Sequence, residues 1–291
     1  MASILPRVEQ LSSRVVRLLG CNPGPMTLQG TNSYLIGTGE RRILLDTSNP
    51  NHPEYLQNLK TVLRDQKTGI QEILLTHWHL DHVGAVPEIC QDLTDSSDMP
   101  ISKYQRISTE DAPLGDGLKY SFIEDGKVFK TEGGTLRAVY TPGHTDDHLS
   151  FYLEEENALF SGDCILGQGT AVFEDFYTYM KSLELMLKMK PTIIYPGHGP
   201  VITNPVEKIN EYIAHRMLRE QQILEVFEKH KGVFMSCMDL VKIIYTETPE
   251  HLHHKAADNV CHHLEKLLKE NRVEHGVEEE GRNMWRLKCS L

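Results

Sequence analysis

The chain has 291 residues, of which 40% are hydrophobic and 24% are charged, and its formal net charge is −11. These values are typical of a soluble globular protein with one large domain or a domain plus an appendage, and they exclude fibrous and disordered chains. The apolar runs are far shorter than the roughly 20 residues of a membrane-spanning helix, and the acidic balance argues against binding nucleic acid through the whole surface.

The first twenty residues contain Arg7, Arg14 and Arg17 against one acid, Glu9. A basic start with serines is typical of a mitochondrial transit peptide, but the same residues suit an ordinary first strand, which is the interpretation we favour. The six cysteines of the chain lie far apart without a C-x-x-C pair. This spacing fits free thiols in a reducing compartment.

Up to residue 205, short β-branched or aliphatic runs closed by turn residues alternate with helical stretches. The runs predict strands at residues 33–37, 42–46, 72–76, 135–141, 149–153, 158–161 and 192–195. Helical periodicity is found at residues 53–64, 83–90 and 178–189. This order predicts a layered α/β domain over residues 1–205.

Residues 206–291 have a different pattern and form a second predicted domain. Amphipathic helices are expected at residues 206–231, 236–245 and 251–271, followed by a hairpin of residues 273–275 and 283–287. Three helices and a hairpin predict a winged-helix-like domain. Its nearly balanced charge and the acidic run at residues 278–280 disfavour specific DNA binding.

The sharpest chemical signal is the run His77-x-His79-x-Asp81-His82, directly after an apolar run. It offers four potential metal ligands within six residues, at the point where a buried strand ends. With this spacing, we expect the imidazoles and the carboxylate to lie on two neighbouring faces of one turn. The motif therefore predicts a site that two metal ions share.

Three further candidate ligands, His144, Asp163 and His198, each follow a glycine at the end of a short apolar run. Glycine lets the backbone turn sharply and present the next side chain outward. Because these residues follow successive predicted strands, we expect all seven candidates to form one pocket. Such nitrogen and oxygen ligands suit two Zn²⁺ ions, with manganese as the alternative, and paired ions lower the pKa of a bridging water.

Two more residues have expected roles beside the ligands. Asp46, at the end of its own strand, is placed to accept a hydrogen bond from a ligand imidazole rather than to bind metal. His148 could support the site or donate a proton to the leaving group, and we favour support. Asp81 is expected both to bind metal and to orient the proton of the attacking water.

Residues 31–199 resemble the metallo-β-lactamase superfamily through Asp46, the run from His77 to His82, and the three later ligands. The resemblance implies an αββα sandwich with a dinuclear zinc site. In the family pattern one zinc is held by His77, His79 and His144. The other is held by Asp81, His82 and His198, and Asp163 bridges the two. True β-lactamases usually have a cysteine at the position of Asp163 and lack His82, so we do not expect antibiotic hydrolysis.

This metal chemistry serves thioesters, as in glyoxalase II, lactam or lactone rings, and phosphodiesters, as in RNA-processing nucleases. Residues 19–32, 141–148 and 160–167 and the winged-helix-like tail resemble an animal subgroup that cleaves single-stranded RNA in the mitochondrial matrix. The resemblance implies an endoribonuclease in which a water between the two zinc ions attacks phosphorus. A glyoxalase II-like thioesterase and a non-catalytic RNA-binding scaffold are the alternatives. The cytosol is the alternative location, and a monomer is slightly favoured.

Two groups of residues have open roles. The first group consists of cationic and aromatic residues that could contact phosphates or lie on a solvated face. These residues are Lys103, Tyr104, Arg106, Arg216 and Arg219. Histidines that crowd the last predicted helix are His251, His253, His254, His262 and His263. Because these histidines do not share one helical face, we expect them to face solvent and not to form a second zinc site.

Overall fold

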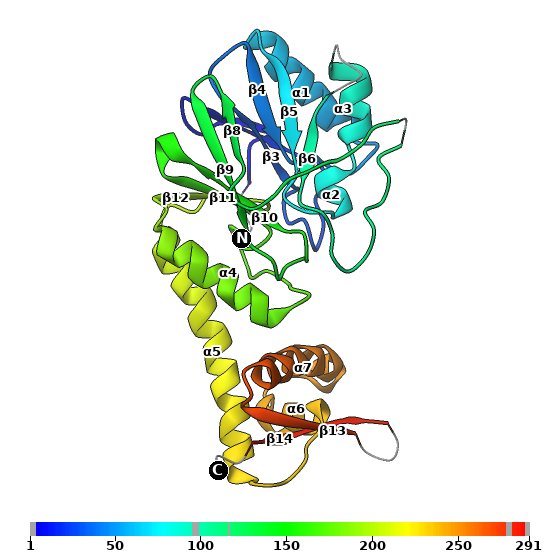
Figure 1. Cartoon of the computed structure of the whole chain (residues 1–291), viewed down its shortest axis with the longest axis vertical. Coiled ribbons are helices and arrows are strands. Elements are labelled where there is room, and N and C mark those ends of the chain that lie inside the picture. Colours follow the sequence, from blue (N-terminus) through cyan, green and yellow to red (C-terminus); the bar gives the residue numbers. More distant parts are fainter. Residues whose placement is uncertain (1–3, 95–98, 116, 278–280, 289–291) are drawn as a thin grey trace. The chain divides into compact units, whose positions relative to one another are not determined.

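The computed structural model describes residues 4–94, 99–115, 117–277 and 281–288. The chain forms two compact units (Figure 1). Unit 1 consists of Met1–Glu174 and Ser182–Ile209, and unit 2 of Asp175–Lys181 and Asn210–Leu291. This division differs from the expected boundary after residue 205 in two ways: residues 206–209 belong to unit 1, and residues 175–181, at the start of one helix, belong to unit 2.

Unit 1 is built on two sheets that face each other (Figure 1). The first sheet has the order β1 (Val8–Gln10), β2 (Val15–Leu19), β3 (Asn32–Ile36), β4 (Arg41–Leu45), β5 (Gly69–Leu74), β6 (Ile101–Lys103) and β7 (Ser121–Phe122). The second has the order β12 (Ile193–Pro196), β11 (Ala158–Gly162), β10 (Leu149–Leu153), β9 (Gly134–Tyr140) and β8 (Val128–Thr131). The first four strands of the first sheet run antiparallel, and β4 to β7 run parallel.

Two apolar layers pack against these sheets. Successive side chains of a strand point to opposite faces, so a single strand contributes to both layers. On β4, Ile43 and Leu45 pack between the sheets, whereas Leu44 packs against helix α1 (Pro53–Asp65). Helix α3 (Val86–Leu93) covers the same outer face through Ile89. Helix α4 (Phe176–Met189) and the short 3-10 helix η1 (Glu154–Glu156) complete the elements before β12.

The expected helix over residues 83–90 is wrong in its extent. The structure has two helices there, α2 (Leu80–Val83) and α3, separated by Gly84 and Ala85. The amide of Ala85 donates to the carbonyl of Ser48 instead of continuing a helix. Pro87 lies in the first turn of α3, where its missing N–H costs nothing, so a new helix starts at that point.

The basic start of the chain forms strands, as we favoured. Strands β1 and β2 pair antiparallel, and the buried side chain of Arg17 makes an ion pair with Glu9 across them. Among the described residues, every helix is too short or too polar to cross a membrane.

Unit 2 has the helices and hairpin expected of a winged helix. Its elements are α5 (Pro205–Lys229, from Asn210 onward), α6 (Cys237–Ile244), η2 (Glu250–Leu252), α7 (His253–Lys269), β13 (Val273–Val277) and β14 (Asn283–Leu287). Ser236 caps α6, and its hydroxyl accepts from the amide of Asp239. Phe227, Leu240, Leu264 and Trp285 meet in the core of this unit. The acidic run at 278–280 lies outside the described residues.

The expectation of free thiols throughout is wrong for one pair. Cys237 on α6 and Cys261 on α7 form a disulfide with a Cα–Cα distance of 5.7 Å. They lie 24 residues apart, and their proximity results from helix packing, which no short sequence spacing reveals. Within the described part of the chain, Cys21, Cys90 and Cys164 form no disulfide.

Reduction of this disulfide is expected to lower the free energy of unfolding of unit 2 by about 3 kcal/mol, because the cross-link restricts the unfolded chain. Amide hydrogen exchange in α6 and α7, measured with and without reductant, checks this. Cys237→Ser should reproduce the effect of reductant, and the control Cys90→Ser in unit 1 should leave these helices unchanged. Equal protection of oxidised and reduced protein would contradict the prediction.

Candidate metal centre

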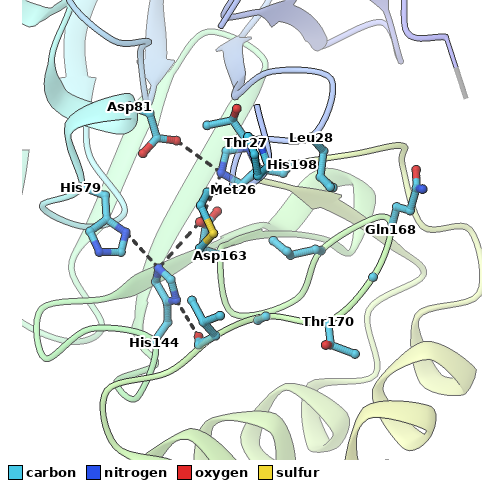
Figure 2. A pocket seen from close by; sticks show the side chains of 15 residues that line it. Met26, Thr27, Leu28, His79, Asp81, His144, Asp163, Gln168, Thr170 and His198 are labelled. Carbon is cyan, nitrogen blue, oxygen red and sulfur yellow. Dashed lines mark hydrogen bonds and ion pairs between the residues drawn. The ribbon is translucent and has the colours of Figure 1, made fainter. Parts of the chain in front are cut away.

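The seven candidate ligands come from four loop regions that follow strands of the two sheets. The region after β5 includes the short helix α2; it carries His77 and His79 before the helix and Asp81 and His82 within it. The remaining ligands follow β9, β11 and β12 and are His144, Asp163 and His198. Figure 2 shows side chains from all four loops pointing toward one another. The structure therefore brings the seven residues together.

One group of ligand atoms surrounds the first of two positions. The Nδ1 atom of His79 lies 2.9 Å from His77 Nε2 and 3.1 Å from His144 Nε2. The carboxylate of Asp163 completes this group, with its Oδ2 atom 3.7 Å from His144 Nε2. One ligand atom from each of the four residues lies within 4.8 Å of the others.

A second group lies beside it. Asp81 Oδ2 is 3.2 Å from His82 Nε2 and 3.3 Å from His198 Nε2. The carboxylate of Asp163 contacts this group as well, at 3.5 Å from His82 Nε2 and 3.2 Å from His198 Nε2. Asp163 therefore lies between the two groups, where a bridging ligand belongs.

The second ring nitrogen of several ligand histidines is held by the protein. His82 Nδ1 lies 2.9 Å from Asp46 Oδ2, and His144 Nδ1 lies 2.8 Å from the carbonyl oxygen of Val172. Asp46 also accepts hydrogen bonds from the amide and hydroxyl of Thr76, both at 2.8 Å. Such partners fix the tautomer and ring orientation of a metal-binding histidine. Asp46 thus has the place expected for it, next to a ligand and not among the ligands.

His148 supports the site and does not reach the pocket. Its ring is fully buried, its Nδ1 contacts the hydroxyl of Thr141 at 2.9 Å, and its Nε2 accepts from the amide of Asp163 at 3.1 Å. Gly162 has φ +48°, and a Cβ atom there would lie 2.6 Å from His148 Nε2. Burial lowers the pKa of His148 well below its usual value, so the ring is neutral. Both ring nitrogens are thus engaged inside the protein, which is the supporting place that the sequence favours for His148 rather than the place of a proton donor.

Burial and neighbouring charges shift the pKa values of the ligand histidines in the metal-free chain, some downward and some upward. Burial, helped by nearby histidines, lowers the pKa of His77 well below its usual value and that of His79 to about 4. Burial also acts to lower the pKa of His82 and His198, but the carboxylates around them outweigh it. The pKa of His198 is raised to about 9.

The site fits divalent ions by its own chemistry. His82 Nε2 and Asp163 Oδ1 are buried and lie 3.5 Å apart, but neither makes a well-aligned hydrogen bond in the part of the chain that the structure describes. Buried polar atoms without partners are costly unless something else binds them. Imidazole nitrogens and carboxylate oxygens are ligands that borderline divalent ions accept, so the cluster suits two of them.

Loading the metal-free chain with zinc near pH 7 is expected to release protons. His198, with its pKa raised to about 9, holds a proton at that pH, and coordination requires the neutral ring. The release therefore shrinks as the pH rises through about 9. Calorimetric titration in two buffers of different ionisation heat measures it, and identical heats in both would contradict the prediction.

Comparison with known proteins identifies this arrangement. The sequence pattern of the metallo-beta-lactamase superfamily matches residues 26–198, which include all seven candidate ligands. The chain belongs to the metallo-beta-lactamase superfamily. Residues 236–285 match the beta-lactamase associated winged helix domain, so the expected fold class is confirmed for both parts. Members of this superfamily are generally metal-dependent hydrolases.

Relatives extend the match over almost the whole chain. A protein named "Beta-lactamase-like protein 2 homolog" from Drosophila melanogaster is 49% identical over 282 residues, which is 96% of each chain. A protein of the same name from Caenorhabditis elegans is 46% identical and covers 92% of this chain and 88% of its own. One named "Thioesterase pkgB" from Emericella nidulans is 44% identical and covers 78% of this chain and 63% of its own.

Solved structures share the fold. A beta-lactamase domain protein from Burkholderia ambifaria superposes with a TM-score of 0.78 at 18% identity, over 99% of this chain and 96% of its own. A metallo-beta-lactamase family protein from Thermus thermophilus gives a TM-score of 0.71 at 20% identity, over 96% of this chain and all of its own.

The pocket of this superfamily member opens directly onto the ligands and has a volume of about 180 Å³ (Figure 2). Two loops form its rim, one with Pro25, Met26 and Leu28, the other from Leu166 to Val172. The side chains of Gln29 and Gln168 join the loops through a 3.1 Å hydrogen bond. The sequence analysis gave no rim residue a role in the site, and among the described residues no lysine or arginine lines this pocket.

The residues with open roles in unit 1 prove to be engaged with other parts of the protein. Lys103 is fully buried, with its Nζ 2.8 Å from Asp147 Oδ2, so it cannot contact a phosphate. Tyr104 stacks on Tyr140 with ring centroids 4.2 Å apart. The guanidinium of Arg106 lies 4.2 Å from the centre of the Trp78 ring.

In unit 2 the remaining candidates are also packed. Arg216 is buried, and the guanidinium of Arg219 lies 3.9 Å from the centre of the Tyr245 ring. The expectation that the late histidines face solvent is wrong for His263, which is buried and contacts the Phe176 ring at 4.4 Å. Its spacing from Val260 and Leu267 places it on the buried face of α7, a signal that helical periodicity contains. Among the described residues, none of these histidines belongs to a metal-binding group.

Proposed function

We propose that the protein is an endoribonuclease that holds two Zn²⁺ ions and hydrolyses phosphodiester bonds of single-stranded RNA. The two ligand groups share Asp163, so their residues would hold the two ions side by side. When bound, such a pair activates a water and stabilises the charge that develops on the phosphate. Asp81 lines the pocket and is ionised, because His82 and His198 hold its pKa low despite burial, so it can accept the proton of that water.

The observation that supports RNA as substrate is a stacked pair beside the ligands. Trp78 lies between His77 and His79, and its ring centroid is 4.6 Å from that of His79. The guanidinium of Arg106 lies over the same indole ring. Aromatic and guanidinium planes hold the unstacked bases of single-stranded RNA, and they cannot hold bases that are paired in a duplex.

A thioesterase is the second candidate, and a specific observation favours it. The pocket rim is largely apolar, and its described residues include no lysine or arginine, which suits an uncharged acyl group. In addition, a relative with 44% identity is named a thioesterase. We keep RNA first because of the resemblance to the RNA-cleaving subgroup and because of the stacked pair. On the same resemblance, we propose that the protein acts in the mitochondrial matrix.

One experiment separates these candidates. Zinc-loaded full chain is incubated with end-labelled single-stranded RNA, with the same RNA as a duplex, and with a glutathione thioester, each with and without chelator. We expect internal fragments from the single strand only, and none with chelator. Release of free thiol without RNA fragments would make the protein a thioesterase, and RNA binding without cleavage would make it a scaffold.

A variant of the stacked pair refines the test. Trp78→Leu is expected to raise KM for single-stranded RNA about tenfold, since one stacked base contributes about 1–3 kcal/mol. The control Phe122→Leu removes an exposed aromatic ring on β7 and should leave KM unchanged. Equal KM values for both variants would remove the support that Trp78 gives to RNA.

A further inference from the structure

The segment from Asn22 to Asn32 contributes no metal ligand, although it carries part of the resemblance to the RNA-cleaving subgroup. It nevertheless contacts two ligands of one half of the site. Thr31 Oγ1 lies 2.8 Å from Asp81 Oδ2, and Thr31 pairs with His198 as an isolated antiparallel bridge. Asn32 contacts the chain on both sides of His198. The segment is therefore placed to act on Asp81 and His198.

The hydroxyl of Thr31 has its hydrogen directed at Asp81. Asn22 Nδ2 donates to Thr31 Oγ1 at 3.0 Å, and Asn22 Oδ1 accepts from the amide of Thr31 at 2.9 Å. A hydroxyl has a single hydrogen, and here its oxygen already accepts from an amide group. The hydrogen therefore goes to Asp81 Oδ2, which holds that oxygen in place as the acceptor. This same oxygen faces the ring nitrogens of His82 and His198.

Asn22 is itself held in place, so the arrangement is rigid. Its Nδ2 also donates to Asn49 Oδ1 at 2.6 Å, and its carbonyl accepts from the hydroxyl of Thr27 at 2.6 Å. Gly30 has φ +129°, and a Cβ atom there would lie 3.1 Å from Asn22 Oδ1. A side chain at residue 30 would thus be strained and would crowd the carboxamide.

Asn32 performs a similar task for His198. Its Nδ2 donates to the carbonyls of Pro196 and Gly199, both at 2.9 Å, and its amide donates to the carbonyl of Gly197 at 2.7 Å. These carbonyls flank His198 on both sides, and Asn32 is 1% exposed. The loop that carries His198 is therefore anchored to the start of β3.

We propose that Thr31 and Asn32 are positioning residues for one half of the metal centre, the half formed by Asp81, His82 and His198. They set the affinity for the metal ion bound there. The other half depends on different partners, since His77 contacts Thr76 and His144 contacts the carbonyl of Val172. The proposal rests on the paired metal site and is independent of whether RNA or a thioester is the substrate.

The test measures zinc affinity of the full chain by competition with a chromophoric chelator. Two zinc ions are expected to bind to the unmodified chain. Thr31→Val should weaken one of them about 10- to 100-fold, the effect of removing a partner of a metal ligand, and leave the other within about twofold. Thr31→Ser keeps the hydroxyl and should restore the affinity. The control Thr38→Val removes a hydroxyl that contacts the carbonyl of Glu132 and should change neither affinity.

A second variant covers the case in which Thr31→Val does not fold. Asn22→Ala frees the Thr31 hydroxyl to turn away from Asp81, so it should weaken the same ion. Circular dichroism of the metal-free variants reports folding. Unchanged affinities in both folded variants, equal weakening of both ions, or failure of Thr31→Ser to restore binding would each overturn the proposal. Zinc affinity is measured without substrate, so the test gives its answer even if the protein cleaves no RNA.

Discussion

Asp163→Asn is expected to lose one of the two metal ions and to slow hydrolysis about 100- to 1,000-fold, a loss comparable to removing one preorganised charge-stabilising group. Asp163 is the side chain that contacts both ligand groups, at 3.7 Å from His144 Nε2 and 3.2 Å from His198 Nε2. An asparagine there has nearly the same shape but lacks the charge that balances two cations. Elemental analysis of the purified variant gives its metal content, and initial rates give the loss of activity.

The matched control is Asp92→Asn, which removes an exposed carboxylate on α3. It should keep both ions and full activity. If Asp163→Asn also retains two ions per chain, the bridging place of Asp163 is wrong. Loss of activity with both ions retained would then assign Asp163 to proton transfer instead.

Lys103→Met is expected to lower the free energy of unfolding by about 3–5 kcal/mol, because it leaves a buried carboxylate without its counter-charge. Lys103 is fully buried, and its Nζ lies 2.8 Å from Asp147 Oδ2 and 2.5 Å from Asp111 Oδ1. Asp147 is also fully buried and belongs to the loop between His144 and His148. The ion pair therefore anchors the ligand loop to the end of β6.

Urea unfolding of the metal-free variant, followed by circular dichroism, measures this loss. Lys60→Met removes an exposed lysine on α1 and should change stability by less than about 0.5 kcal/mol. The double variant Lys103→Met/Asp147→Leu also removes the fully buried carboxylate, leaving only that of Asp111, and should recover part of the loss. A single variant as stable as the Lys60 control would show that the buried pair contributes nothing.

The ligands were accessible to sequence analysis because their signal is local. Each ligand run follows a short apolar strand, and two of the glycines before them, Gly143 and Gly162, adopt the positive φ that such turns require. Apolar runs likewise predicted the long strands, and helical periodicity predicted the amphipathic face of α5. Short-range pattern and turn chemistry were enough for these features.

Other features depend on contacts between distant residues. Strand β7 has two residues, both exposed, and it exists because β6 offers it hydrogen-bonding groups. The buried state of Lys103 depends on Asp111 and Asp147, and the disulfide depends on how α6 packs against α7. No periodicity or motif contains this information, since a lone lysine or cysteine reads the same in a loop as in a core.

Anomalous diffraction from crystals of the zinc-loaded full chain tests the central claim most directly. The account predicts two anomalous peaks in each chain. One should lie among His77, His79 and His144, the other among Asp81, His82 and His198, with the carboxylate of Asp163 next to both. Crystals without a peak at these residues, or with metal bound only elsewhere, would contradict the account.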